Sequence, residues 1–464
     1  MINLLIILHI YFVSFLDKPE KTAPQLSPRA VEQRAKWDIQ TDAMDYPVSP
    51  MYMNELTKIG VKIHHKSRWF NGVTCEMDDK LAAQVSALKF VTAVEMTREA
   101  EKKFLRPKKR AVETGLSDNY TDAQLDLFNL RPLHEAGFEG KGILMAICDG
   151  GFYRADELNC FRQKELELGH FDFTDDSDGF YGSTGTHGTE CLSVISGIKE
   201  GFYGAATKAQ YYLMRSEEDA TESPKEMDNL VAALEAADSL GVNIFSVSLG
   251  YALFDNELWD LPKTALDGKS TRASQAATIA ARKGMLVCAA IGNEGDDDWK
   301  ILSVPADADS ILTVGAVNTS GVIAGFSSYG PSADGRVKPD VCAVGNQATL
   351  IRPDGTIIRG NGTSFATPLI AGLAACLWSA LPDENAMQIR ERIIRSSDRY
   401  AEPDSERYGY GIPDAWKAYK NETTETESIQ QSVFRIQKVL RNGQLYLMYK
   451  GTKYDVQGRR ICDW

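Results

Sequence analysis

The stretch GILMAICDGG, residues 142–151, decides the fold class, because six consecutive apolar residues end abruptly at Asp149 and two glycines. An apolar run of this length, bounded by glycines, is typical of a strand that is buried on both faces of a sheet. Further runs of the same kind follow at residues 209–216, 242–251, 284–293, 311–317 and 338–345. We therefore predict a sheet that is covered on both sides, within a domain of residues 111–420.

Segments with helical composition lie between these strands. They include HGTECLSVISG at residues 187–197 and two longer segments at residues 223–241 and 271–284. Strands that alternate with helices form crossovers, which make neighbouring strands parallel and place helices on both faces of the sheet. The pattern predicts an α/β domain of three layers, α/β/α, with a mostly parallel sheet. In such sheets active sites lie at the carboxyl ends of the strands.

Residues 10–98 follow a different plan, namely a strand, two helices, two strands, a helix and a last strand. The first two helices each begin with a serine and a proline, at Ser27 and Ser49, as is typical of capped helix starts. This order predicts a small α+β domain close to the ferredoxin-like plan. Six lysines and arginines follow between residues 102 and 110, in a linker that is either a solvated connector or an accessible cleavage site.

The two ends of the chain are expected to lie outside these domains. The first sixteen residues are apolar, but the run is shorter than a membrane span and lacks a basic start and a small-residue cleavage motif. Residues 1–9 are therefore interpreted as a truncated signal peptide, and no later segment is predicted to span a membrane. Residues 421–464 form a Thr/Glu-rich linker and a short β-rich tail with turn signals at Asn442-Gly443 and Gly451.

Charge and cysteine usage argue against two classes of function. The formal net charge is −13 and no basic stripe interleaves with aromatic residues, so a nucleic-acid partner is not expected. Most of the eight cysteines lie inside apolar runs without zinc-site spacing, and they are predicted to be small buried side chains. The acidic loops at residues 175–178 and 296–298 fit solvated turns as well as calcium ligands, because no EF-hand spacing is present. No metal residues are therefore predicted.

Four polar residues follow the expected strands or begin the expected helices. They are Asp149, His187, Asn293 and Ser364, the last in GNGTSFATPLIAGLAA, where Pro368 fits a first helical turn. Each residue alone fits a turn, a helix cap or an ordinary satisfied side chain. Together they supply a carboxylate, an imidazole, an amide and a hydroxyl at one edge of a parallel sheet. Acyl transfer to serine needs this set, because a base must take the hydroxyl proton and a carboxylate must orient the base.

The motifs AICDGG, GTHGTECLSVISG, SVSLGY, AAIGNEG and GTSFATPLIAG, in the order Asp, His, Ser, resemble those of subtilisin-type serine peptidases. Chymotrypsin-like enzymes and α/β-hydrolases have other chain orders. The resemblance implies that Asp149 orients His187, that His187 acts as general base and then acid, and that Ser364 is the nucleophile. It also implies an oxyanion hole formed by the Asn293 side chain and the backbone N–H of Ser364.

The same resemblance implies where substrate binds. A strand like SVSLGY pairs with the extended substrate, and AAIG forms part of the wall of the first specificity pocket. The substrate-binding residues implied in this way are Ser248, Leu249, Gly250, Tyr251, Ala289, Ala290 and Gly292. Many relatives have a glycine at the position of Tyr251, so this side chain is expected to narrow or cover the subsites on the amino-terminal side of the cleaved bond.

The front unit, residues 10–110 with its linker, resembles subtilase propeptides, which assist folding and inhibit the enzyme until they are cut away. Segments such as YPVSPMY and KSRWFNGVTCE, and the C-terminal tail, are similar to those of secreted Bacteroidetes-type enzymes, whose tails act in sorting. The sequence thus predicts a secreted or cell-surface serine endopeptidase, made as a proenzyme and inhibited by its own propeptide. Its substrates are proteins or peptides, and its chemistry needs no cofactor. A catalytically silent binding or scaffold protein and an esterase are the alternatives.

Overall fold

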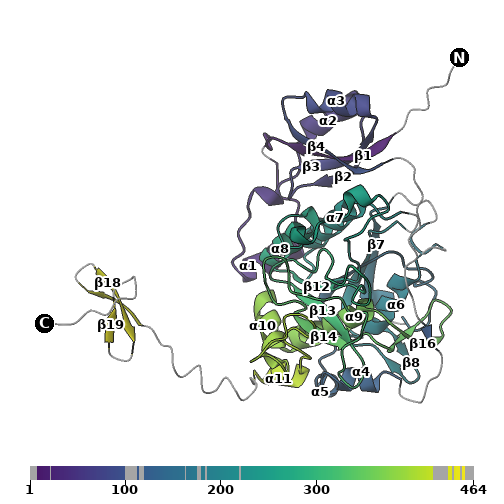
Figure 1. Cartoon of the computed structure of the whole chain (residues 1–464), viewed down its shortest axis with the longest axis vertical. Coiled ribbons are helices and arrows are strands. Elements are labelled where there is room, and N and C mark those ends of the chain that lie inside the picture. Colours follow the sequence, from purple (N-terminus) through teal and green to yellow (C-terminus); the bar gives the residue numbers. More distant parts are fainter. Residues whose placement is uncertain are drawn as a thin grey trace.

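The computed structural model describes residues 8–20, 22–99, 120–161, 164–174, 179–182, 185–218 and 221–421, and the backbone of residues 112–113, 437–441, 444–449 and 452–454. Figure 1 shows a small domain seated on a larger α/β domain, with the strands of the tail beyond a linker. The basic linker, the acidic loop at residues 175–178 and residues 1–7 of the expected signal peptide lie outside the described residues.

Within the described residues, the larger domain is built on a sheet of seven strands. In spatial order they are β14 (Val341–Val344), β13 (Leu312–Val317), β12 (Leu286–Ala290), β11 (Ile244–Val247), β6 (Leu144–Asp149), β10 (Gln210–Arg215) and β7 (Glu167–Asp172). Every neighbouring pair is parallel, which confirms the predicted sheet. Strand β7 was not predicted, because this edge strand has exposed and half-buried residues in alternation rather than an apolar run.

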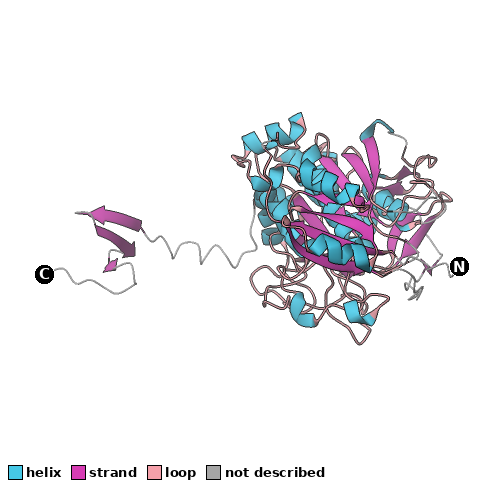
Figure 2. Ribbon diagram, turned by 90° about the horizontal axis from the view of Figure 1, so that it is seen from above, coloured by secondary structure: helices cyan, strands magenta, loops and turns pink. Residues whose placement is uncertain are grey.

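Successive residues of β6 face two different hydrophobic cores. Met145 and Ile147 pack in one core with α6 (His187–Ser196) and α9 (Thr363–Ala380). Ala146 and Cys148 pack in a second core with α7 (Lys225–Leu240) and α8 (Arg272–Arg282). Because the side chains of a strand alternate between its faces, helices cover both faces of the sheet (Figure 2). The three-layer prediction is confirmed.

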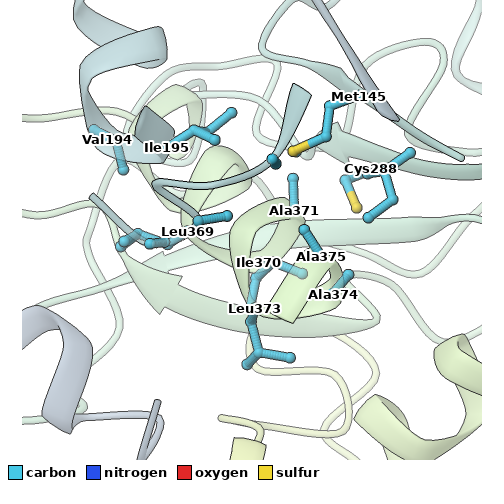
Figure 3. Close-up of a cluster of buried hydrophobic side chains, with 14 of the residues drawn as sticks. Met145, Val194, Ile195, Cys288, Leu369, Ile370, Ala371, Leu373, Ala374 and Ala375 are labelled. Atoms are coloured by element: carbon cyan, nitrogen blue, oxygen red, sulfur yellow. The ribbon is translucent and has the colours of Figure 1, made fainter. Parts of the chain in front are cut away.

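Helix α9 runs through the first core. Figure 3 shows Leu369, Ile370 and Ala371 of this helix in one apolar cluster with Met145 of β6 and Ile195 of α6. By length and composition α9 resembles a membrane span, but 89% of its apolar window is buried inside the protein. Its apolar character is therefore that of a core helix. Such a central helix provides a rigid base for the residues at its amino-terminal end.

Shorter elements complete the larger domain. A hairpin of β15 (Ala348–Ile351) and β16 (Ile357–Gly360) precedes α9, and β5 (Val112–Glu113) joins β16 as a third antiparallel strand. The remaining elements are α4 (Asp122–Asp126), α5 (Arg131–Glu135), β8 (Ile198–Lys199), β9 (Phe202–Tyr203), α10 (Ala386–Ser396), α11 (Ala415–Lys420) and 3-10 helices at Lys164–Leu166, Glu257–Trp259 and Lys263–Ala265. Strands of two to four residues show too little periodicity to be predicted.

The small domain has the predicted order of elements. They are β1 (His9–Phe15), α1 (Pro28–Lys36), a 3-10 helix (Ala43–Asp45), α2 (Pro50–Lys58), β2 (Lys62–Ser67), β3 (Gly72–Met77), α3 (Asp79–Ser86) and β4 (Val91–Arg98). The antiparallel sheet order β2-β3-β1-β4 is the ferredoxin-like one. As predicted, the hydroxyls of Ser27 and Ser49 cap α1 and α2. Because β1 begins at His9, the apolar start of the chain supplies the first strand of this domain.

Helix α1 stands apart from the core of the small domain, which is formed by the sheet with α2 and α3. It packs on α7 of the larger domain, where Arg34 pairs with Asp238 at 2.7 Å. Arg68, just after β2, pairs with the same carboxylate, and Ser67 donates to Glu235 of α7 at 2.5 Å. The small domain is therefore joined to α7 by buried ion pairs and hydrogen bonds.

The tail contains strands, as predicted. They are β17 (Gln437–Arg441), β18 (Gln444–Tyr449) and β19 (Thr452–Tyr454), and they form an antiparallel sheet. Arg441 pairs with Gln444, so the Asn442-Gly443 pair stands in the sequence where a two-residue hairpin turn is expected.

Candidate active site

The carboxyl ends of β6, β11 and β12 lie side by side in the sheet. Strand β6 ends at Asp149, and the segments after β11 and β12 contain Ser248 and Asn293. From β6 the chain first builds β7 and β10 on one side and then returns to β11 on the other side. Ligands bind at such a reversal of strand order in parallel α/β sheets. The position of the candidate site therefore follows from the topology.

Two helices bring the remaining predicted residues to the same place. Helix α6 begins with His187, and α9 begins one residue before Ser364. The two helices are in contact, and the ring centroids of His187 and Phe365 lie 5.7 Å apart. The four residues that the sequence singled out thus come together from β6, α6, the end of β12 and α9.

Asp149 and His187 form a hydrogen-bonded pair. Oδ1 of Asp149 lies 2.7 Å from Nδ1 of His187 and also accepts from the N–H of Gly150 at 2.8 Å. The carboxylate side chain is 1% exposed, whereas the imidazole is 15% exposed. A buried carboxylate at Nδ1 favours the tautomer in which Nε2 accepts a proton, and it stabilises the imidazolium that then forms.

Ser364 lies in the first turn of α9 and is bonded to the segment after β11. Its hydroxyl donates to the carbonyl of Ser248 at 3.2 Å, and the Ser248 hydroxyl donates to the carbonyl of Ser364 at 2.9 Å. The second bond depends on Pro368, because a proline four residues on has no N–H for that carbonyl. Pro368 is the sixth residue of α9, so the prediction of a first-turn proline was wrong. Because Pro368 has no N–H, the carbonyl of Ser364 is left to accept from the Ser248 hydroxyl, and this bond fixes residue 364.

Asn293 is exposed and is held by the residue that precedes Ser364. Its Oδ1 accepts from the N–H and from the hydroxyl of Thr363, at 2.8 and 3.0 Å. With the amide oxygen engaged, the NH2 group is left to donate to an incoming group. The first N–H groups of α9 have no acceptor within the helix. The side-chain amide and the start of α9 are thus donors of the kind that stabilises an oxyanion.

Sequence reasoning missed Cys191, which lies one helical turn after His187. Its Sγ is 3.9 Å from both ring nitrogens of His187 and donates to the carbonyl of Ser364 at 3.4 Å. Burial, and secondly the charge of Asp149, raise the pKa of this thiol well above its usual value, so it remains neutral. The spacing of four residues on a helix is the signal that could have found it. All seven cysteines in the described part of the chain are buried, as predicted for most of the cysteines, and they are free of disulfide bonds.

The predicted substrate-binding residues differ in accessibility. Ser248 and Leu249 are buried behind the exposed Gly250. Ala289 and Ala290 are the buried last residues of β12, and Gly292 is half-buried just beyond them. The two glycines therefore form the accessible part of this set, and the other residues support them.

The expectation that Tyr251 covers the subsites before the cleaved bond was wrong. The Tyr251 side chain is 1% exposed and belongs to the core on the α7 and α8 face of the sheet. Its backbone forms an antiparallel bridge with Val304, with N–H to carbonyl distances of 2.8 and 2.9 Å. Burial, and secondly the carboxylate of Glu217, raise the pKa of the tyrosine hydroxyl. The bridge ties the backbone of Tyr251 to Val304 and leaves the ring in the core.

Comparisons with known proteins agree with this geometry. The family model described as Subtilase family, peptidase S8, matches residues 140–411, which is more than half of the chain. The chain belongs to the subtilase family. A model of the peptidase S8 propeptide domain of Bacteroidota matches residues 10–113 and so covers the small domain of this subtilase.

The curated relatives are bacterial proteases. Subtilisin NAT of Bacillus subtilis subsp. natto is 27% identical over 361 residues, which cover 77% of this chain and 83% of the relative. Serine protease AprX of Bacillus subtilis (strain 168) is 26% identical over 313 residues, covering 60% of this chain and 66% of the relative. Subtilisin of Bacillus pumilus is 29% identical over 265 residues, covering 56% and 86%. This subtilase is therefore a serine protease of the S8 type with an N-terminal propeptide domain.

Proposed function

We propose that this subtilase is an exported endopeptidase, made as a proenzyme, that cleaves peptide bonds in protein or peptide substrates. The observation that supports it most strongly is that an imidazole held by Asp149 and an amide held by Thr363 both lie beside the first turn of α9, which carries Ser364. Asp149 engages Nδ1 of His187, which leaves Nε2 for proton transfer. Thr363 engages Oδ1 of Asn293, which leaves the amide NH2 group to donate. The proposed chemistry involves no cofactor, and the acidic loop at residues 296–298 takes no part in it.

In the proposed first step, Oγ of Ser364 attacks the carbonyl carbon of the scissile bond while Nε2 of His187 takes the hydroxyl proton. The hydroxyl donates to Ser248 at rest, so it must rotate toward His187 when substrate enters. Asp149 holds Nδ1–H and stabilises the imidazolium. The imidazolium then protonates the leaving amine, and the acyl-enzyme is hydrolysed by water with the same base.

The negative charge on the carbonyl oxygen is proposed to fall between Nδ2 of Asn293 and the N–H of Ser364. Both donors are fixed before substrate arrives, and the start of α9 adds the positive end of a helix dipole. Donors that need no reorganisation stabilise the transition state more than the ground state. These groups would therefore act on turnover rather than on substrate affinity.

The small domain is proposed to inhibit the enzyme from the side of the cleft that lies before the scissile bond. Arg98, the last residue of β4, pairs with Glu218 at 2.6 Å. Glu218 follows β10, and the adjacent Glu217 lies against Gly150, next to the catalytic carboxylate. The carboxyl end of the small domain therefore reaches the edge of the proposed catalytic site, where its linker can compete with substrate.

A fluorophosphonate probe, which reacts with an activated serine, tests this function. We expect labelling of Ser364 in the processed wild-type protein, and loss of both labelling and processing in Ser364→Ala. The exposed Ser320 in a surface turn offers a matched control, because Ser320→Ala should keep both. A processed wild-type protein without the label would support a silent binding protein instead. Cleavage of esters, with a peptide library left intact, would support an esterase.

A further inference from the structure

We propose that a polar cavity beside β16 binds a carboxylate, and that Arg359 is the residue that anchors it. The space between Tyr120, Asn318, Asn346 and Arg359 is called the β16 cavity below. The proposal goes beyond the proposed function, because none of the proposed reacting groups lines this cavity. The carboxylate comes either from an acidic side chain of a polypeptide strand that pairs with β16 or from a free small dicarboxylate.

The β16 cavity has the size and the lining of a site for a small polar group. Its volume is about 340 Å³, which lies within the range of small-molecule sites. It is lined by amides, hydroxyls, one alanine and one charged side chain, that of Arg359. All of the lining residues belong to the described part of the chain, and none of them is acidic. The cavity therefore offers hydrogen-bond donors and a positive charge, which favours an anionic ligand.

Arg359 brings a half-buried guanidinium to the cavity, and no described carboxylate forms an ion pair with it. Two other arginines of the larger domain differ in this respect, because Arg390 pairs with Asp340 and Arg392 pairs with Glu384. A guanidinium presents a planar fork of N–H donors that matches the two oxygens of a carboxylate. A carboxylate in the cavity would therefore supply the partner that Arg359 lacks within the described part of the chain.

Two side-chain amides of the cavity add further donors. Oδ1 of Asn318 accepts from the N–H groups of Ser320 and Val322, at 2.9 and 3.0 Å, so its NH2 group is the part left for a ligand. The NH2 group of Asn346 donates to no group in the described part of the chain. These two asparagines follow β13 and β14, and ligands of parallel α/β sheets bind at this edge of the sheet.

Other lining residues give the cavity a fixed shape. Oε1 of Gln124 accepts from the N–H of Thr349 at 2.8 Å, and Nε2 of Gln124 donates to the carbonyl of Thr349 at 3.3 Å. The hydroxyl of Thr349 donates to the carbonyl of Tyr120 at 2.9 Å. Thr349 is opposite Arg359 in the pairing of β15 with β16, so both side chains lie on the same face of the hairpin. A wall that is held in this way lowers the cost of ordering the site when a ligand binds.

The register of β5 on β16 indicates how a polypeptide can bring a carboxylate to the cavity. The two strands are antiparallel, and Glu113 is the residue opposite Arg359. Residues that are directly opposite each other on antiparallel strands share a face, and pairs of opposite charge stabilise the pairing. Extended segments add to the edge of a sheet through their backbone, while alternate side chains enter pockets. A strand with an acidic residue at this position therefore places it on the face of β16 that carries Arg359.

Calorimetric titration of the full chain carrying Ser364→Ala tests the proposal, because binding is then measured apart from catalysis. The probes are glutarate and its neutral diamide, glutaramide, which has the same carbon chain without the charges. We expect glutarate to bind at least about 10-fold more tightly than glutaramide, and Arg359→Gln to weaken the binding of glutarate by about 10- to 100-fold. Arg352→Gln is the matched control and should keep the affinity, since Arg352 is a half-buried arginine of the same hairpin that does not line the cavity.

Glu113→Gln in the same chain distinguishes the two sources of the carboxylate. If a polypeptide strand supplies it, this substitution removes a competitor and should raise the affinity for glutarate a few-fold. If a free dicarboxylate is the ligand, the affinity should stay the same. Glutarate that binds no better than glutaramide would refute the proposal without any substitution at residue 359, and glutarate that binds equally well to Arg359→Gln would refute the role of Arg359. Neither result bears on the proposed peptidase function, which the fluorophosphonate probe tests separately.

Discussion

The proposed catalytic cleft and the interface between the two domains use charge in opposite ways. In the cleft, the close pair of Asp149 with His187 stands among amides, hydroxyls and glycines. At the interface, opposite charges meet in a buried network. Arg34 pairs with Asp45 and Asp238, Lys283 of the larger domain pairs with Asp45, and the side chains of all four are at most 5% exposed.

The difference follows from what each region must do. A catalytic cleft has to leave donors unengaged until negative charge develops on the substrate, so its polar groups are fixed through their other atoms. An interface that, under the proposed function, later releases its partner needs specificity more than net affinity. Buried ion pairs suit this purpose, because the desolvation of the charges offsets most of their attraction. The comparison predicts that substitutions in the cleft change turnover, whereas substitutions at the interface change inhibition.

The largest effect that tests the comparison is expected at Asn293. Asn293→Ala removes one proposed oxyanion donor and should lower kcat about 10²–10³-fold, a range known from subtilisin itself, with little change in KM. Steady-state kinetics on the processed enzyme would measure it. Asn318→Ala, in a turn after β13, is a control for loss of an amide elsewhere. An equal loss in kcat and in substrate affinity would count against the oxyanion role.

An intermediate effect is expected at Arg68, whose backbone N–H and guanidinium contact Glu235 and Asp238 of α7. Arg68→Ala removes one of the two arginine partners of the buried Asp238 carboxylate, the other being Arg34, which costs about 2 kcal/mol, or about 30-fold in the affinity of the cleaved small domain. Dilution of the processed complex, with recovered peptidase activity as readout, reports this affinity.

Arg29 provides the matched control for Arg68. It is an exposed arginine of α1, and it donates to Asn243 and Gly241 across the same interface. Arg29→Ala should change the affinity by less than about 1 kcal/mol, because exposed polar contacts contribute little. If the two variants weaken inhibition equally, or if Arg68→Ala lowers kcat of the released enzyme, the contrast between cleft and interface fails.

The cleft could be predicted from the sequence because its residues belong to strand ends and helix starts. Asp149 and His187 each follow a local signal, and the sheet topology then brings them together. The interface could not be predicted in this way, because its partners, such as Arg34 and Asp238, are 204 positions apart and have no local signature. The prediction for Tyr251 was wrong for a related reason. The direction of its ring depends on the bridge to Val304, which is 53 positions away and has no local signature.

The prediction of strands from the sequence has the same limit. The six apolar strands were predictable because burial on both faces leaves continuous apolar runs. The edge strand β7 and the short strands β5, β15 and β16 were not, because their pairing is set by distant segments.

The smallest effect is expected from pH, through His65 of β2. Its Nε2 lies 2.8 Å from the carbonyl oxygen of Phe173 and 3.0 Å from Oδ1 of Asn229, both in the larger domain. Burial lowers the pKa of His65 below its ordinary value of 6.5, and the charge of Lys225 and the neighbouring His64 act in the same direction. The complex therefore holds this imidazole neutral, whereas the released small domain returns it to its ordinary pKa.

The sign of the pH effect follows from this difference. Above the ordinary pKa the imidazole is neutral in both states, so pH has no effect through this group. As the pH falls through about 6.5, the released domain binds a proton that the complex does not, and dissociation becomes more favourable. We expect the processed complex to recover activity a few-fold more readily at pH 5.5 than at pH 7.5, and His65→Gln to reduce this dependence. His170→Gln, in the edge strand β7, is the control, and a pH dependence that His65→Gln leaves unchanged would assign the effect to other groups.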